Sequence, residues 1–302
     1  MTRSIHLRFA TVPSGLACYP RVVLTPRQAV TEVVEPPEFH ARVERVKLQK
    51  TDIAKYAAVC GFDVAAGGVP VTYPHILAMP LHLKIFATEA FPLRPMGLIH
   101  LSNVIETPGE IHPGMTVDVD VSLRMYRKTD AGIVFDLDSQ LASGGRALWR
   151  ETCVFLSRWP DSVERKGGRP PRPPKAPKDA RVLQELDVTQ RTAWQYARVS
   201  RDFNPIHLSD RAARFFGLRG AISHGMWALA RALAEAPRTA SGTASRLETQ
   251  FLTPVQLPAK VAIKEWTDDG ATRRAMCDVR TGRVHMYAHW TSARYAKEKV
   301  PA

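Results

Sequence analysis

The chain contains the same helix-forming pattern twice, and this repetition constrains the fold more than any other feature. Residues 56–61 read Tyr-Ala-Ala-Val-Cys-Gly, and residues 196–201 read Tyr-Ala-Arg-Val-Ser-Arg. A helix-start signal precedes each copy, Thr-Asp at residues 51–52 and Asp-Val-Thr at residues 187–189. The two copies therefore predict that the chain is built from two halves of the same design.

Each copy is followed by an apolar stretch of helical length and then by strands. The apolar stretches are residues 76–87 and 226–236, and Pro80 inside the first is expected to kink that helix. Alternating apolar residues and turn signals predict four strands in each half. The strands are expected at residues 98–106, 115–127, 133–142 and 146–156, and then at 245–252, 259–265, 271–279 and 283–290. Helices followed by an antiparallel meander, twice over, predict a duplicated α+β domain.

A basic, proline-rich segment separates the two halves. Residues 165–181 contain seven Lys or Arg residues, one Asp and five prolines. Proline at this density excludes helix and central strand, so the segment is expected to be an extended linker. We therefore divide the chain into four parts: an N-terminal extension at 1–38, a first domain at 39–160, the linker at 161–180 and a second domain at 181–302.

Composition excludes several classes of protein. The chain of 302 residues contains no apolar run long enough to span a membrane, and Arg8 and Pro13 interrupt any signal peptide. Its four cysteines form no C-x-x-C pair, which indicates thiols in a reducing cytoplasm. The net charge of +13 is concentrated partly in the linker, and no nucleic-acid-binding motif accompanies it. We expect a cytoplasmic protein that binds no nucleic acid.

The second half carries a polar run that its first-half counterpart lacks. Tyr196 and His224 lie 28 residues apart, against 19 residues between the corresponding Tyr56 and His75. The added segment contains Asp202 and His207, which would diverge on a continuous helix.

A break in that helix changes the expected geometry. Pro205 ends the helix, and a turn at Asn204-Pro205 can bring the imidazole of His207 back beside the carboxylate of Asp202. Such a pair is suited to general acid–base catalysis.

The sequence Ser223-His224-Gly225 lies just before the second apolar helix. Glycine allows a close approach of the backbone, and the N–H groups at a helix start point towards any oxygen bound there. These donors would stabilise an enolate-like oxyanion. Ser223 lacks the G-x-S-x-G context of a nucleophile, so Ser223 and His224 are expected to support the turn. The Asp and His positions also lack the spacing of a known metal site.

The run resembles the hydratase motif of MaoC-like dehydratases, the (R)-specific enoyl-CoA hydratases. The matching pattern is Y-A-x-x-S-x-D-x-N-P-I-H, then A-x-x-x-G, then I-x-H-G-M, and residues 69–75 strengthen the match in the first half. Two halves with the motif only in the second are similar to double-hotdog 3-hydroxyacyl-thioester dehydratases. The resemblance implies a hotdog fold in each half, in which an antiparallel sheet wraps a long helix. It also implies that Asp202 and His207 are the catalytic pair, Gly225 is the oxyanion donor and Asn204 orients the pair.

The function implied is interconversion of (R)-3-hydroxyacyl and trans-2-enoyl thioesters of CoA or acyl carrier protein in fatty-acid metabolism, without a metal or redox cofactor. The first half lacks Asn-Pro-x-His after Asp63, so it is expected to be non-catalytic and to leave a groove for the acyl chain. Two alternatives stay open: an acyl-thioesterase on the same fold, and a non-catalytic acyl-binding partner subunit.

Further expectations concern packing. The two sheets should join side by side, which makes a monomer or a homodimer plausible. Met226 and Trp227 are expected in the core. The first-half histidines have no acid at a useful spacing and are expected to be structural; they are His75, His82, His100 and His112.

Overall fold

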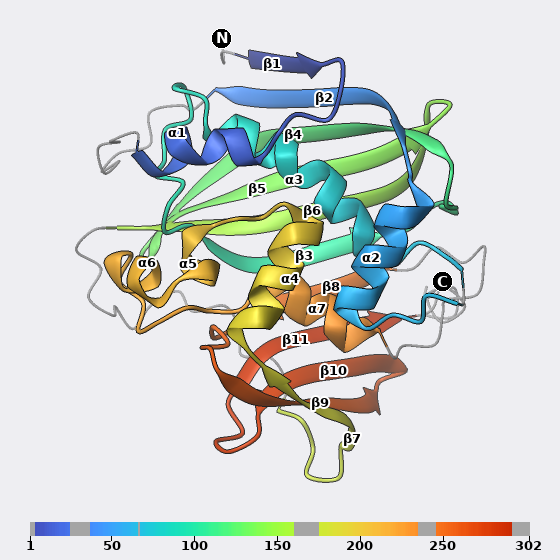
Figure 1. Cartoon of the computed structure of the whole chain (residues 1–302), viewed down its shortest axis with the longest axis vertical. Coiled ribbons are helices and arrows are strands. Elements are labelled where there is room, and N and C mark those ends of the chain that lie inside the picture. The colour runs from blue at the N-terminus through green and yellow to red at the C-terminus, as the bar shows by residue number, and fades with distance from the viewer. Residues whose placement is uncertain (1–3, 25–36, 66, 160–174, 235–245, 292–302) are drawn as a thin grey trace, which may run out of the picture.

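A single sheet of eleven strands runs through the computed structural model, which describes residues 4–24, 37–65, 67–159, 175–234 and 246–291 (Figure 1). The strand order is β1-β2-β4-β5-β6-β3-β8-β11-β10-β9-β7. The strands are β1 (Ser4–Phe9), β2 (Glu38–Lys47), β3 (Ile99–Glu106), β4 (Thr116–Thr129), β5 (Gly132–Ser143), β6 (Arg146–Arg158), β7 (Arg181–Val188), β8 (Arg246–Phe251), β9 (Ala259–Asp268), β10 (Ala271–Asp278) and β11 (Val284–Thr291). All neighbours pair antiparallel except β1 and β2, which are parallel.

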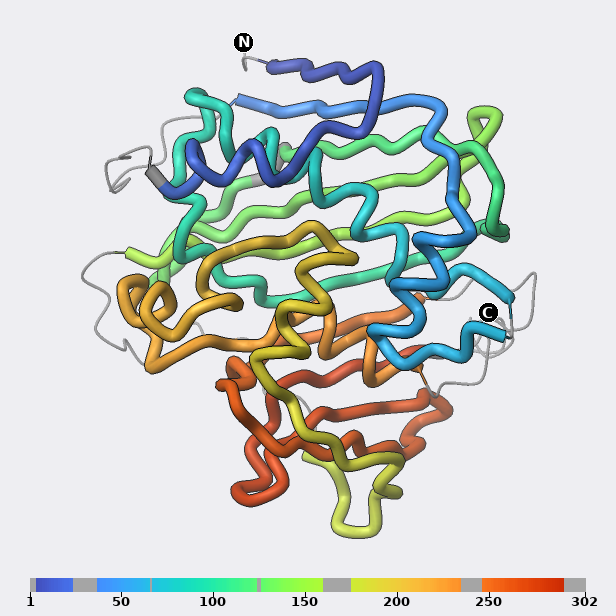
Figure 2. The backbone as a smooth tube through the Cα atoms, in the orientation of Figure 1, coloured from blue at the N-terminus to red at the C-terminus, as the bar shows by residue number. Residues whose placement is uncertain are grey.

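The two halves of the sheet have the same connectivity and meet at one strand pair. Apart from β1, which adds to the outer edge of β2, the strand before the repeated helix is the outermost in each half, and the strand after the central helix lies at the junction. There β3 pairs with β8, so that Asn103 lies opposite Thr249. The backbone trace shows one uninterrupted sheet across this junction (Figure 2). The prediction that the halves join side by side is therefore confirmed.

The predicted strand arrangement was wrong in one respect and incomplete in another. Only three strands of each half form a meander, because β3 and β8 cross to the junction instead of pairing with the next strand. Three strands were also missed, namely β1, β2 and β7. Both β2 and β7 precede the helices and pair with β4 and β9, so each half begins with a strand rather than a helix.

The repeated sequence forms a pair of matching helices. Helices α2 (Lys50–Cys60) and α4 (Gln190–Ser200) both have 11 residues and end in a left-handed residue, Gly61 at φ 82° and Arg201 at φ 61°. They pack together, with the ring centroids of Tyr56 and Tyr196 6.2 Å apart. The repeat thus predicted both elements correctly.

The central helices fill the concave side of the sheet. Helix α3 (Tyr73–Phe86) packs on β2, β4 and β5, and α7 (Gly225–Leu233) packs on β10 and β11. Pro80 is buried within α3. Met226 and Trp227 are 5% and 2% exposed, which confirms that they belong to the core. A long helix wrapped by an antiparallel sheet in each half is the predicted double hotdog.

The link between the helices differs most between the halves. Residues 61–72 join α2 to α3, whereas residues 201–224 join α4 to α7 and form the short helices α5 (Pro205–Leu208) and α6 (Asp210–Phe215). Near the N-terminus, the turn η1 (Leu16–Cys18) leads into α1 (Tyr19–Leu24). Most of the linker predicted at 161–180 lies outside the described residues. Among the helices described here, none has the length and apolar character needed to cross a membrane.

Candidate active site

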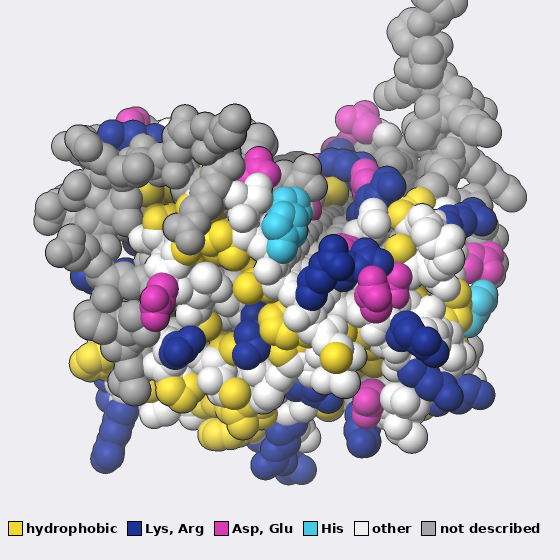
Figure 3. All heavy atoms as spheres, turned by 90° about the horizontal axis from the view of Figure 1, so that it is seen from above, with side chains coloured by type: hydrophobic (Ala, Val, Ile, Leu, Met, Phe, Trp, Pro, Cys, Tyr) yellow, Lys and Arg dark blue, Asp and Glu magenta, His cyan; other side chains and the backbone are white. Residues whose placement is uncertain are grey.

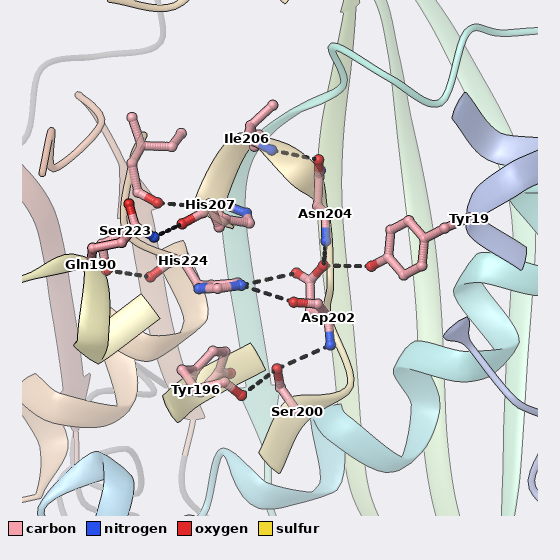
Figure 4. Close-up of polar contacts among 11 residues, drawn as sticks. Tyr19, Gln190, Tyr196, Ser200, Asp202, Asn204, Ile206, His207, Ser223 and His224 are labelled. Atoms are coloured by element: carbon pink, nitrogen blue, oxygen red, sulfur yellow. Dashed lines mark hydrogen bonds and ion pairs between the residues drawn. The ribbon is translucent and has the colours of Figure 1, made fainter. Parts of the chain in front are cut away.

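Asp202 follows the left-handed residue that ends α4, and its two carboxylate oxygens have different surroundings (Figure 4). Oδ1 accepts a hydrogen bond from the Tyr19 hydroxyl at 2.7 Å and another from the backbone N–H of Asn204 at 3.1 Å. Oδ2 lies 4.0 Å from Nε2 of His224. The side chain is 19% exposed, so one carboxylate oxygen is anchored while the other faces the imidazole side of the site.

The predicted turn at Asn204-Pro205 is present. Asn204 has an extended ψ of 121° and caps α5, its Oδ1 accepting from the N–H of Ile206 at 3.4 Å. Helix α5 then carries His207 back towards Asp202, so that a ring nitrogen and a carboxylate oxygen lie within 4.8 Å. Nδ1 of His207 donates to the carbonyl of Ile222 at 2.9 Å, which leaves the lone pair on Nε2.

His224 packs flat against His207. Their ring centroids are 3.7 Å apart with an interplanar angle of 28°, and the other face of His224 contacts the Tyr196 ring at 5.0 Å. Nε2 of His224 donates to the backbone carbonyl of Asp202 at 3.1 Å. His224 therefore contacts both the imidazole of His207 and the backbone of Asp202.

Burial and hydrogen bonding fix the protonation states. Burial alone would raise the pKa of Asp202, but the imidazoles of His224 and His207 and the hydrogen bonds from Tyr19 and Asn204 bring it below its usual value. Burial lowers the pKa of His207, although the charge of Asp202 partly opposes this. Burial, helped by His207, lowers the pKa of His224 to about 3. At neutral pH the site therefore contains one carboxylate and two neutral imidazoles.

Gly225 is the first residue of α7, with His224 as the N-cap. The first N–H groups of a helix have no acceptor within it, so the N–H of Gly225 has no acceptor inside α7. A Cβ at this position would lie 3.2 Å from the ring of Phe251, which shows how closely the backbone is approached here. Ser223 is buried beside it, and its hydroxyl makes a long 3.5 Å contact with the carbonyl of His224.

A second buried acid–imidazole pair lies in the first half, where none was expected. Nδ1 of His75 is 2.9 Å from Oε2 of Glu151, and Asn103 donates to Oε1 of the same carboxylate at 2.7 Å. Burial opposes both charges, but the pair interaction prevails, raising the pKa of His75 and lowering that of Glu151 to about 2. Spacing along the sequence does not predict this pair, because 76 residues separate His75 from Glu151. Nε2 of His82, by contrast, is hydrogen-bonded to the hydroxyl of Ser139 at 2.8 Å.

Two groups of side chains within the described residues have atoms close enough to share a metal ion. One is Asp202, His207 and His224, and the other is His75, Glu151 and Cys153. In the first group Nδ1 of His207 and Nε2 of His224 already donate to backbone carbonyls. In the second, Asn103 donates to both Glu151 and Cys153.

Comparison with known proteins points to the dehydratase family that the sequence motif resembles. A family model described as a MaoC like domain matches residues 172–288. The 3-hydroxyacyl-thioester dehydratase X of Mycobacterium tuberculosis is 30% identical over 279 residues, covering 92% of this chain and 98% of that protein. A crystal structure of that protein, HtdX, superposes with a TM-score of 0.72 and 28% identity over 84% of this chain and 99% of that one.

A more distant structure shares the fold. The MaoC-like dehydratase of Phytophthora capsici has a TM-score of 0.66 at 18% identity, covering 87% of this chain and 97% of that one. Together with the double-hotdog sheet and the site around Asp202, the identity to the mycobacterial enzyme shows the family. The chain belongs to the MaoC-like dehydratases, which are hydro-lyases.

Proposed function

We propose that this enzyme interconverts (R)-3-hydroxyacyl and trans-2-enoyl thioesters in fatty-acid metabolism, with Asp202 and His207 as the catalytic pair. The observation that carries the proposal is the approach of a ring nitrogen of His207 to within 4.8 Å of the carboxylate of Asp202. A neutral imidazole with its Nε2 lone pair free and an ionised carboxylate can together hold and deprotonate one water molecule.

In the hydration direction, the pair removes a proton from this water as its oxygen attacks C3 of the enoyl thioester. The electrons of the double bond move towards the thioester carbonyl, and the proton is then delivered to C2. Dehydration is the reverse: the pair removes a proton from C2 and protonates the departing hydroxyl at C3. Atoms balance without a redox partner, so we propose that no cofactor takes part.

Negative charge develops on the carbonyl oxygen of the thioester during both hydration and dehydration. We assign the N–H of Gly225 to this oxygen, because the start of a nine-residue helix presents unpaired N–H groups and a favourable dipole there. Asn204 orients the pair by capping α5 and donating its N–H to Asp202. Ser223 and His224 support the turn.

An anionic carrier, either CoA or acyl carrier protein, fits the surface beside the site. Residues 191–219 expose six arginines that have no carboxylate partner within 4 Å in the part of the chain described; they are Arg191, Arg198, Arg201, Arg211, Arg214 and Arg219. Figure 3, which views the molecule from above, shows Lys and Arg side chains with Asp and Glu side chains among them. Unpaired positive charge next to a site favours an anionic substrate and makes its binding depend on salt.

The division of labour between the halves is part of the same proposal. We assign catalysis to residues 181–302 and accommodation of the acyl chain to residues 39–160, because only the second half has the long 201–224 segment over its helix. A cytoplasmic location fits the four cysteines, all of them buried free thiols. The β3–β8 junction joins the halves within one chain, which is compatible with a monomer or a homodimer.

The test is a hydration assay with crotonyl-CoA and a long-chain enoyl-CoA, followed by loss of enoyl absorbance. Conversion to the (R)-3-hydroxyacyl thioester is expected, with KM rising as salt is added. Release of free thiol without hydration would instead support the thioesterase alternative. Absence of both reactions with CoA and carrier-protein substrates would leave the non-catalytic partner subunit as the better interpretation.

A further inference from the structure

A residue from outside the motif reaches the carboxylate of Asp202. Tyr19 opens α1 and lies 183 residues before Asp202, yet its hydroxyl donates to Oδ1 at 2.7 Å, a distance typical of a charge-assisted bond. It also lies outside residues 172–288, to which the MaoC-like family model is matched. Figure 4 shows the Tyr19 ring on the side of Asp202 opposite to His224.

The segment around Tyr19 is packed rather than loosely attached. Cys18, Tyr19 and Val22 are 2%, 8% and 5% exposed. A Cβ at Gly15 would lie 3.0 Å from Leu83 of α3 and 3.8 Å from the carbonyl of Arg201. The segment therefore fits between the central helix of the first half and the residue before Asp202, so the Tyr19 hydroxyl is held in place from both sides.

We propose that Tyr19 is a positioning residue for the catalytic carboxylate, an inference that rests on the proposed function. With the N–H of Asn204, its hydroxyl occupies Oδ1 and fixes the rotation of the carboxylate. Oδ2 is then the oxygen left to face water and substrate. The N-terminal segment thereby completes an active site whose other groups come from the second half.

The charge state of the site depends on every group around Asp202. Its carboxylate is faced by Tyr19 from α1 and by the imidazoles of His207 and His224. Burial, followed by the charges of Cys60 and Asp202, raises the pKa of Tyr196 of α4. Burial lowers the pKa of His75 of α3, but Glu151 and, to a smaller extent, Asp202 raise it overall. Burial, followed by the charge of Asp202, raises the pKa of Tyr19 itself, so the hydroxyl remains a donor throughout the assay range. Its bond favours the ionised carboxylate.

The test is Tyr19→Phe, which removes only the hydroxyl. We expect kcat to fall about tenfold or more, as for other hydrogen bonds to a charged group, with KM changed less than about twofold. The acid limb of the pH–rate profile should move up by about one pH unit, because protonation of the Asp202–His207 pair becomes easier. Tyr126→Phe is the matched control, since that buried hydroxyl has no partner in the described residues; it should behave as the parent.

Two results would overturn the proposal. One is a Tyr19→Phe enzyme with the parent kcat and pH profile. The other is a loss of kcat that is equal at all pH values, with no shift of the acid limb, which would indicate a structural role alone.

A readout without substrate separates this proposal from the function it rests on. The pKa of Asp202 in the folded protein is below its ordinary value of 3.8. The ionised carboxylate therefore stabilises the folded protein fully above pH 3.8, and this stabilisation is lost as the pH falls through the pKa of the folded state. The difference in urea midpoint between parent and Tyr19→Phe should therefore be constant from neutral pH down to pH 3.8 and narrow as the pH is lowered further. If the parent hydrates no thioester, the proposed function fails, but the narrowing still tests the hydrogen bond between Tyr19 and Asp202. A difference in urea midpoint that does not depend on pH would contradict the proposed role of Tyr19.

Discussion

Replacing Asp202 by asparagine is the most direct test of the catalytic assignment, because the structure lets the charge be removed with little change in shape. The amide oxygen can still accept from the Tyr19 hydroxyl and from the N–H of Asn204. The amide NH₂ then takes the place of Oδ2, where it faces the Nε2–H of His224 at about the present 4.0 Å. The local fold is therefore kept, but the oxygen that could take a proton is lost.

The size of the effect follows from two losses. Asp202 no longer accepts or donates the transferred proton, and the pKa of His207 falls further because the charge that raised it is gone. We expect Asp202→Asn to lower kcat by roughly 10²–10⁴-fold, the usual worth of a positioned acid–base group. This corresponds to about 3–5 kcal/mol of transition-state stabilisation. The assay is enoyl-CoA hydration, with circular dichroism to show that the variant is folded.

Controls decide whether the loss belongs to this pair. His207→Ala should have a comparable effect, and the double variant should be far less damaged than the product of the singles, because both serve one proton-transfer unit. Asp63→Asn, in the exposed loop after α2, should keep nearly full activity. A folded Asp202→Asn enzyme with the parent rate would refute the assignment. If Asp63→Asn lowered kcat instead, catalysis would have to be assigned to the first half.

Three further outcomes are expected. The hydration rate should fall as the pH is lowered through the pKa of His207, which burial places below 6.5; an acid limb above 6.5 in the pH–rate profile would contradict this. Gly225→Ala should lower kcat roughly tenfold or more, since the new Cβ meets Phe251 at 3.2 Å and shifts the oxyanion donor; unchanged steady-state kinetics would remove Gly225 from the mechanism. Glu151→Gln should cost about 3 kcal/mol of unfolding free energy at neutral pH, because it leaves His75 buried without its counter-charge. This difference in unfolding free energy should be complete above pH 4.5. It should narrow when urea denaturation is repeated towards pH 2, where the carboxylate of the parent becomes protonated.

Local patterns in the sequence were sufficient for much of the fold. The alternation of Val117, Val119, Val121 and Leu123 appears in β4 as side chains that are at most 2% exposed. The turn at Asn204 was also predictable, because proline restricts both its own backbone and that of the preceding residue. Strands β2 and β7 were not predicted, although β2 carries a period-two signal in Phe39, Ala41 and Val43, which are all buried.

Contacts between distant residues were beyond sequence reasoning. Tyr19 lies in a segment with no motif, and only the packing of α1 on α3 and of Gly15 near Arg201 brings it to Asp202. The pairing of His75 with Glu151 likewise depends on the register of β6 beneath α3. No spacing rule connects residues 183 or 76 positions apart, so both require the assembled sheet. The order of strands at the junction depends on the same assembly.

The two buried acid–imidazole pairs explain in physical terms why we assign catalysis to one half only. In the first half, both oxygens of Glu151 lie within 3.0 Å of Nδ1 of His75, and Asn103 donates to one of them. This pair is closed: its carboxylate is 0% exposed, and its pKa of about 2 keeps that carboxylate ionised near neutral pH. In the second half, the side chain of Asp202 is 19% exposed. Within the described residues, the nearest charged partner of its Oδ2 is Nε2 of His224, at 4.0 Å. A closed pair stabilises the core, whereas an open pair can hold water. Glu151→Gln should therefore lower stability while leaving kcat of the folded enzyme within about twofold of the parent, and a loss as large as that of Asp202→Asn would show that the first pair takes part in the chemistry.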